Sequence, residues 1–302
     1  MNIRDLEAFI AVVETGSIIS ASARLNLTQP GVTRRIQNLE ERLGAVLLDR
    51  QSKPLKPTPA GREAYEHGRR VLRTVEDLKV SVSPSGEIQG EFRVGVMPYF
   101  SEAALTIPLD RLRACFPRLT LRVTSAWSIR LLEQLNRNEL DAAVLCLGHG
   151  DSPPENLLGH DLGTQEVLIV AAPGLGAPSP ASLADLSRFP WVMNESGCGF
   201  RTYIRRQFEK ARLPFQVGVE ALSADLRMSL VARGHGIGIV TPAAFASSPW
   251  RDQVRVIDTI DFHPRVQSWV LHREPTGWLN RPIAVLLEAI IEALHSPAPF
   301  TA

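Results

Sequence analysis

The feature that most constrains this fold is a pair of helical patterns between residues 17 and 43. Asn26, Leu27 and Thr28 interrupt the two patterns. On both sides of that break, apolar residues recur at steps of three and four, which is the spacing of a buried helical stripe. They are Ile18, Ala21 and Leu25 before the break, and Val32, Ile36, Leu39 and Leu43 after it. The pattern predicts a short helix, a tight turn and a longer helix.

The ends and the polar face of the second helix fit this prediction. Thr28 is placed to cap its N-terminus, and Pro30 loses no hydrogen bond because the first N–H groups of a helix are unpaired. Gly44 can end the helix in a left-handed conformation. The face opposite the stripe carries Gln29, Thr33, Arg34, Arg35 and Gln37. Such a face is typical of a recognition helix in the major groove of DNA, or of an αα-hairpin with a solvated basic surface.

The flanking segments favour a compact DNA-binding unit. Residues 2–14 predict a first helix with one apolar face, and residues 46–48 predict a strand. The chain from 49 to 57 then predicts a hairpin, or wing. Its cations are Arg50, Lys53 and Lys56. They could contact phosphates or a minor groove beside the recognition helix, or they could form a solvated edge that prevents strand pairing.

A long helix is predicted from Thr58 to about Val82, because Thr58 can cap it and Pro59 suits its first position. One side carries a seam at alternating steps of three and four, formed by Tyr65, Gly68, Leu72, Val75 and Val82. A largely apolar seam on one side of a helix has to be covered by another surface. We expect the same helix of a second subunit, and the alternative is packing on its own domain.

From Glu91 onward, strand and helix patterns alternate, which predicts α/β architecture with parallel sheets. We expect a winged helix-turn-helix domain (1–57), a linker and dimerisation helix (58–86) and an α/β domain (87–302). The α/β domain is expected to have two lobes, with lobe I formed by 87–163 and 267–302, and lobe II by 164–266. Two such lobes leave a cleft, and ligands favour clefts at the carboxyl ends of parallel strands.

Composition bounds the class of protein. A chain of 302 residues suits two or three domains. Its net charge of +1 means that affinity for DNA has to come from a local patch. No apolar run is long enough to cross a bilayer, and charged residues interrupt the first turn where a signal peptide would begin. We expect a soluble cytoplasmic protein without a membrane partner.

The sequence offers little for catalysis or metal binding. It has no Gly-x-Ser-x-Gly elbow, no P-loop and no Rossmann fingerprint, and the glycine-rich run 234–238 lies between a predicted helix and a strand. The three cysteines are scattered, and the histidines lack metal-ligand spacing. We expect no enzymatic activity, no cofactor and no metal. The competing classes are an enzyme built on the α/β half, and a small-molecule-binding protein whose N-terminal unit serves only in dimerisation.

Several motifs resemble those of the LysR-type transcriptional regulators, and together they cover nearly the whole chain. In the N-terminal part these motifs are residues 6–9, 21–25, 28–36, 39–44, 48–50 and 55–61. Further on, residues 139–143 and 230–238 are similar to two landmarks of the family's effector domain. Ser22 and Gly31 stand where the family usually has alanine. Gly31 inside a recognition helix costs up to about 1 kcal/mol relative to alanine.

The resemblance implies a winged helix-turn-helix, a long linker helix and a bilobed α/β effector domain like that of periplasmic binding proteins. It also implies a homo-oligomer, a dimer or a dimer of dimers, whose paired winged domains read an imperfect palindrome in double-stranded DNA. A small-molecule effector would bind the cleft and alter DNA bending. A symmetric dimer agrees with this, because it requires two-fold related half-sites.

For base reading we expect Gln29, Thr33 and Arg34, because glutamine suits adenine and arginine suits guanine in the major groove. Pro30 can give an apolar contact to a thymine methyl group. The remaining candidates are phosphate contacts, namely Arg35, Arg50, Lys53 and Lys56.

We expect four loops to line the effector site, namely residues 98–101, 125–128, 194–200 and 221–223. The resemblance to the family implies the same loops. Their candidate residues are Tyr99, Ser101, Ser125, Ser128, Ser196, Gly197, Cys198, Phe200, Leu222 and Ser223. Helix N-termini in these loops could offer free N–H groups to carboxylates or other anions. Ser101 and Ser128 could equally be plain helix caps, and Trp127 could stack on a ligand or fill the cleft.

Cys198 lies at a predicted helix N-terminus, where a thiolate would be stabilised. A redox sensor would also need a second cysteine to resolve a sulfenic acid, and none lies nearby in the sequence.

Overall fold

The computed structural model describes residues 2–82, 88–98, 100, 102–275 and 277–295. The chain divides into two compact units, residues 1–90 and 91–302. No helix in the described ranges is both long enough and apolar enough to cross a membrane.

The N-terminal unit is a helical bundle with a small hairpin. Its elements are α1 (Ile3–Thr15), α2 (Ile18–Leu25), α3 (Gln29–Leu43), β1 (Leu48–Asp49), β2 (Lys56–Pro57) and α4 (Pro59–Ser81). Phe9 of α1 and Leu39 of α3 are fully buried at its centre. The predicted stripe on α3 is buried as far as Leu39, but Leu43 is 46% exposed and was wrongly assigned to the core.

The predicted capping of α3 is confirmed. The Thr28 hydroxyl accepts a hydrogen bond from the Gly31 N–H at 3.2 Å, and Gly44 has a φ of 65°. Asn26, with a φ of 53°, ends α2 in the left-handed conformation that reverses the chain. Ser22 is buried in α2, but its hydroxyl donates to the Ile19 carbonyl at 2.8 Å, so that its polar group is satisfied.

The hairpin is fastened to α3 by one carboxylate. Glu40 of α3 accepts the backbone N–H groups of Leu47 and Leu48 at 2.8 and 3.3 Å through Oε1. Its other oxygen pairs with Arg50 at 2.8 Å. β1 and β2 then pair antiparallel, with Leu48 opposite Pro57. The position of the wing relative to α3 is therefore set by charge-assisted hydrogen bonds.

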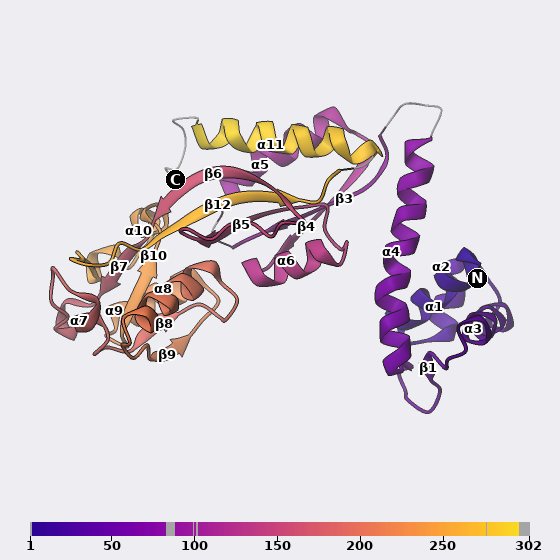
Figure 1. The fold of residues 1–302 in the computed structure, drawn as a ribbon, viewed down its shortest axis with the longest axis horizontal. Coiled ribbons are helices and arrows are strands. Elements are labelled where there is room, and N and C mark those ends of the chain that lie inside the picture. Colours follow the sequence, from indigo (N-terminus) through magenta and orange to yellow (C-terminus); the bar gives the residue numbers. More distant parts are fainter. Residues whose placement is uncertain (1, 83–87, 99, 101, 276, 296–302) are drawn as a thin grey trace. The chain divides into compact units, whose positions relative to one another are not determined.

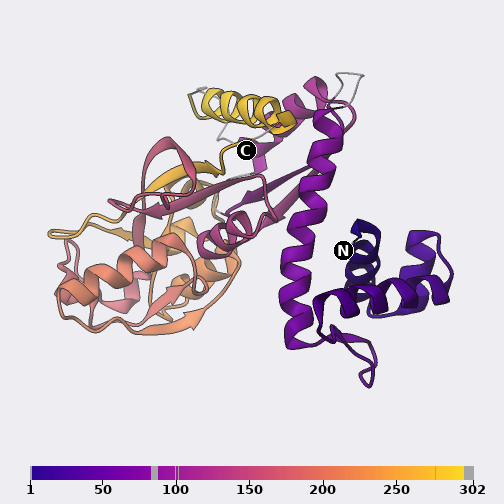
Figure 2. The same cartoon turned by 45° about the vertical axis from the view of Figure 1, so that its right-hand side comes forward.

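The long helix α4 has two parts with different surroundings (Figures 1 and 2). In the first part, Tyr65 and Leu72 pack on the core of the N-terminal unit, and Gly68 lies against Leu6. The second part extends beyond this bundle. Apolar side chains on α4 and at its C-cap with large exposed fractions are Val71 (40%), Leu78 (61%) and the C-cap residue Val82 (70%). The predicted seam is thus divided, and part of it packs on its own unit.

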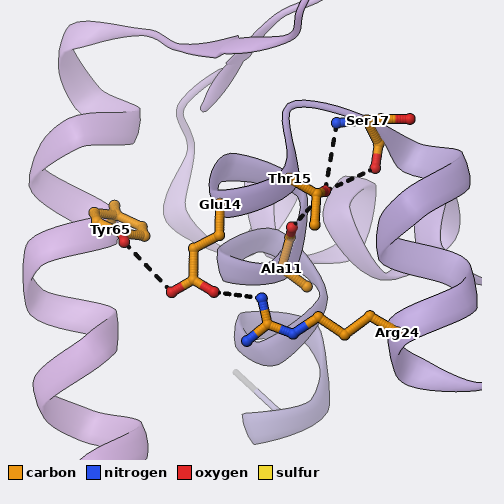
Figure 3. A network of polar contacts seen from close by, with 6 residues as sticks. All are labelled: Ala11, Glu14, Thr15, Ser17, Arg24 and Tyr65. Atoms are coloured by element: carbon orange, nitrogen blue, oxygen red, sulfur yellow. Dashed lines mark hydrogen bonds and ion pairs between the residues drawn. The ribbon is translucent and has the colours of Figure 1, made fainter. Parts of the chain in front are cut away.

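A polar network joins α1, α2 and α4 (Figure 3). Glu14 of α1 pairs with Arg24 of α2 at 2.5 Å and accepts a hydrogen bond from the Tyr65 hydroxyl of α4 at 3.4 Å. At the end of α1, the Thr15 hydroxyl lies 2.8 Å from the Ala11 carbonyl and accepts the Ser17 N–H at 3.4 Å. Glu14 therefore ties the first helix pair to the long helix.

The C-terminal unit is an α/β domain with two five-stranded sheets. Lobe I contains β3 (Gly90–Val96), α5 (Glu102–Cys115), β4 (Leu119–Ser125), α6 (Ser128–Asn136), β5 (Ala142–Gly148), β6 (Leu158–Glu166), β12 (Arg265–His272), η3 (Gly277–Leu279) and α11 (Asn280–His295). Lobe II contains β7 (Leu168–Ala171), η1 (Pro173–Leu175), α7 (Leu183–Leu186), β8 (Trp191–Met193), α8 (Gly199–Lys210), β9 (Val217–Glu220), α9 (Ala224–Ala232), β10 (Ile237–Val240), α10 (Pro242–Ser247), η2 (Arg251–Gln253) and β11 (Arg255–Ile257).

Both sheets are mixed, which corrects the expectation of parallel sheets. The strand order is β4-β3-β5-β12-β6 in lobe I and β11-β7-β10-β8-β9 in lobe II. β3 and β5 are parallel, as are β8 with β9 and with β10, but β12 runs antiparallel to both of its neighbours. α5 and α11 lie on one face of the lobe I sheet and α6 on the other (Figure 1). β6 and β12 carry the chain from one lobe to the other.

The close contact of Gly61 in α4 with the Leu47 carbonyl gives a test of how the N-terminal unit is packed. A Cβ at Gly61 would lie 2.0 Å from the Leu47 carbonyl oxygen, so Gly61→Ala requires the backbone to shift. We expect this variant to destabilise the unit by more than about 3 kcal/mol, measured by urea unfolding of the full chain and hydrogen exchange of α1–α3.

Gly31→Ala is the matched control. Its Cβ would meet only the Thr28 hydroxyl at 3.1 Å, and the gain in helix propensity of about 1 kcal/mol favours the variant. Equal stabilities for the two variants would contradict the close contact at Gly61.

Candidate functional sites

A hollow of about 660 Å³ lies on the exposed surface of α3 and the start of α2. Its lining is Ile18, Gln29, Pro30, Thr33, Arg34 and Gln37. All four side chains predicted to face bases are therefore together. Gln37 and Ile18 extend the same surface, and the sequence pattern had placed Gln37 on this face without a role.

The predicted phosphate contacts do not line this hollow. Arg35 is half-buried, and its guanidinium donates to the Arg4 carbonyl at 3.4 Å. Arg50 is held by Glu40, as described above, with 59% of its side chain exposed. Lys53 and Lys56 are exposed on the wing.

A second concavity, of about 900 Å³, lies between the two lobes of the C-terminal unit. Its lining is Pro98, Ser125, Ala126, Trp127 and Arg130 from lobe I, and Glu195, Leu222, Ser223, Ala224, Leu226 and Arg227 from lobe II. Of the predicted effector residues, Ser125, Leu222 and Ser223 line it. Tyr99 and Ser101 lie outside the described residues.

The other predicted effector residues do not line this pocket. Ser196 is exposed but not part of the lining, and Gly197 uses its carbonyl to accept the Ile129 N–H at 3.2 Å. Ser128 is 2% exposed, and its hydroxyl donates inward to the Cys146 carbonyl at 2.7 Å. The first turn of α6 is thus occupied by the chain's own Gly197 carbonyl, which leaves less of this N-terminus for an anion than the sequence suggested.

The start of α8 is also packed against lobe I. Cys198 is fully buried and Phe200 is 1% exposed. A Cβ on Gly199 would lie 2.4 Å from the Cys146 carbonyl oxygen, so only glycine allows this approach. Burial raises the pKa of the Cys198 thiol, although the N–H groups of Arg201 and Phe200 oppose it. Burial therefore opposes thiolate formation at this helix N-terminus.

The chemistry of the pocket is apolar with a few charges. Leu222 and Leu226 are 58% and 51% exposed, which is unusual for leucine side chains in a concave site. Arg130 and Glu195 are exposed at the pocket. Arg227 is 4% exposed and donates to the Ala221 and Leu222 carbonyls at 2.8 and 2.7 Å, which fixes the loop before α9.

The sequence analysis did not single out Arg130, Leu226 and Arg227, which line the pocket from helices, whereas Glu195 lies in one of the expected loops. The signal available for the three was their place in the first turns of α6 and α9, two helices that follow strand ends.

A helix-turn-helix with a basic wing, followed by a two-lobed domain with a ligand-sized pocket, defines a ligand-responsive DNA-binding protein. Residues 3–62 match the model of the bacterial regulatory helix-turn-helix protein, lysR family. Residues 85–295 match that of the LysR substrate binding domain. The chain belongs to the LysR family. It is a DNA-binding transcriptional regulator with an effector-binding domain.

Individual relatives agree with this assignment. The chain is 28% identical over 293 residues to the DNA-binding transcriptional dual regulator OxyR of Escherichia coli, covering 96% of this chain and 95% of OxyR. It is 27% identical over 252 residues to the nitrogen assimilation regulatory protein nac of the same species, covering 82% of this chain and 80% of nac.

Solved structures share the fold. Full-length CbnR complexed with its target DNA superposes with a TM-score of 0.66 at 21% identity, covering 97% of this chain and 100% of CbnR. A variant of full-length OxyR from Pseudomonas aeruginosa gives a TM-score of 0.70 at 19% identity, covering 96% of this chain and 94% of OxyR.

The buried thiols give a testable expectation. Burial raises the pKa of Cys146 to about 12, and Cys115 is exposed. In the native protein at pH 8, a chromogenic disulfide reagent should therefore modify Cys115 quickly and the other two thiols only after denaturation. Cys115→Ser should remove the fast phase, and a fast phase that persists in this variant would contradict the burial of Cys146 and Cys198.

Proposed function

We propose that α3 reads operator bases through Gln29, Thr33 and Arg34, and that Pro30 contacts a thymine methyl group. The observation that carries this proposal is the hollow on α3, because it gathers these four side chains on one exposed surface. Glutamine and arginine can each make paired hydrogen bonds to one purine edge.

The cations around the hollow hold the protein on the phosphate backbone. Lys53 and Lys56 project from the wing, and Arg50 keeps a fixed position because Glu40 binds it. Arg35 supports the start of α1 through the Arg4 carbonyl and offers its remaining donors to a phosphate.

Two copies of the chain bind DNA together through α4. Val71, Leu78 and Val82 form an exposed apolar row at steps of seven and four, which the same helix of a second subunit can cover. A two-fold dimer matches a palindromic operator, and two dimers can join into a tetramer. The protein acts in the cytoplasm, by binding and without catalysis.

The effector occupies the interlobe pocket and is an apolar molecule with one negatively charged group. Leu222, Leu226 and Trp127 offer it apolar contact area. Arg130 offers a cation, since its pairing with Glu133 at 3.4 Å is exposed and weak. The hydroxyl of Ser128 is directed away from the pocket, towards the Cys146 carbonyl.

The base-reading role is tested with Arg34→Ala. We expect a loss of about 1–3 kcal/mol in binding to the operator and a much smaller loss on random duplex DNA, because a purine contact is lost. The measurement is fluorescence anisotropy with DNA from upstream of the protein's own gene, over a series of salt concentrations. The control is Lys53→Ala, which should weaken both complexes equally and lower the salt dependence. Equal loss on both duplexes for Arg34→Ala would remove its base-reading role.

The pocket is tested with the fluorescent apolar anion 8-anilinonaphthalene-1-sulfonate. Leu226→Asp should weaken its binding about fivefold or more, because a charge replaces apolar contact area. The control is Ile260→Asp, at a position 64% exposed outside the pocket, which should leave the affinity unchanged. The probe should quench the fluorescence of Trp127, and this part of the quenching should be absent from Trp127→Phe. The comparison shows whether the probe binds beside Trp127. Identical affinities for both aspartate variants would refute this placement.

A further inference from the structure

The row of side chains that Gln29 and Thr33 begin on α3 continues for one more turn, to Gln37. Residues four apart lie on the same side of a helix, so these three side chains follow one another along α3. All three line the hollow on α3, together with Pro30 and Arg34. The hollow therefore extends from the first residue of α3 to a point about two turns further along the helix.

The side-chain amide of Gln37 is available to a partner outside the protein. It is exposed, and it makes no hydrogen bond within the part of the chain that the structure describes. The hydroxyl of Thr33, in contrast, donates to the backbone carbonyl of Gln29 at 3.0 Å. Thr33 therefore offers a base its oxygen lone pairs and its methyl group, whereas Gln37 offers both a donor and an acceptor.

The next side chain of the row limits the surface that can face DNA. It is Glu41, which is exposed and does not line the hollow. Outside the hollow its carboxylate would meet phosphates, which repel it. The surface that faces the groove therefore ends at Gln37.

Among the four bases, adenine matches a glutamine amide in the major groove. It presents the N7 acceptor beside the N6 amino donor, and the NH₂ group and carbonyl of one glutamine can bond both together. Guanine presents two acceptors at this edge, cytosine presents a donor, and thymine presents an acceptor beside its methyl group. A glutamine that meets a base edge here therefore selects an A·T pair.

We propose that Gln37 is a further specificity-determining residue, which reads an adenine in each operator half-site beyond the bases read by Gln29, Thr33 and Arg34. This inference rests on the proposed base-reading role of α3. Eight residues of helix span about 12 Å, and each base pair adds about 3.4 Å along the duplex, so this adenine lies about three to four pairs from the one that Gln29 reads. The helix α3 then lies along the major groove and contacts bases over its first two turns.

A base-by-base scan of the operator with the full-length protein tests the role of Gln37. DNA from upstream of the protein's own gene is varied at one position at a time, symmetrically in both half-sites, and each duplex competes for the protein in fluorescence anisotropy. Gln37→Ala should lose an about tenfold preference for A·T at one pair, about three to four pairs from the pair where Gln29→Ala loses its preference. Alanine favours the helix, so Gln37→Ala keeps α3 intact.

Gln37→Glu should change the preference at the same pair instead of removing it. A carboxylate accepts from the amino group of cytosine, so the preferred base should pass from adenine to cytosine, while the added negative charge weakens binding to every duplex. The matched control is Asn38, the neighbouring amide, which does not line the hollow. Asn38→Ala and Asn38→Asp should both keep the base preferences of the wild type, and the aspartate should weaken binding to all duplexes alike.

The outcomes separate the role of Gln37 from that of α3 as a whole. If Arg34→Ala loses a base preference while Gln37→Ala keeps every preference of the wild type, α3 reads bases without Gln37, and the inference is overturned. A preference lost by Gln37→Ala at a pair other than A·T overturns the choice of adenine. If neither variant changes any preference, the base-reading role of α3 fails, and the inference fails with it.

Discussion

The contact between residues 197–199 and the end of β5 determines the geometry of the effector domain. The Cys146 carbonyl accepts the Ser128 hydroxyl and lies so close to Gly199 that no side chain fits there. The Gly197 carbonyl closes the start of α6. Because the Ser128 hydroxyl is used within lobe I and the Gly197 carbonyl of lobe II is used on the start of α6, the remaining concavity between the lobes is lined mainly by apolar side chains. The apolar character of the pocket therefore follows from the polar groups that are already hydrogen-bonded at this contact.

The DNA-binding unit depends on a comparable small set of contacts. Glu40 connects the recognition helix to the wing, and the close approach of Gly61 to the Leu47 carbonyl connects the wing to α4. Both are short and specific, so a movement of α4 changes the wing and the recognition helix together. This rigidity offers a physical route from α4 to the exposed surface of α3.

Local patterns predicted local structure well. The cap at Thr28, the left-handed Gly44 and the helical stripe as far as Leu39 were correct, because each depends on a few neighbouring residues. β6 gives no strand signal of its own, because it is an outer strand whose sequence, LGHDLGTQE, has no alternation of apolar residues. The seam on α4 was predicted as one surface, but its first part is covered by α1, which a single helical pattern does not reveal.

The sequence by itself determined the class of protein, the order of its domains and the side chains on the exposed face of α3. Helical periodicity and capping are local properties of the chain. Tertiary structure decided which predicted residues share a site. It turned Ser128 inward, buried Cys198 and brought Arg130 and Leu226 to the pocket. It also placed His160 against His272, 112 positions apart in the chain. Such pairings depend on strand register and on the packing of distant segments, which no local pattern encodes.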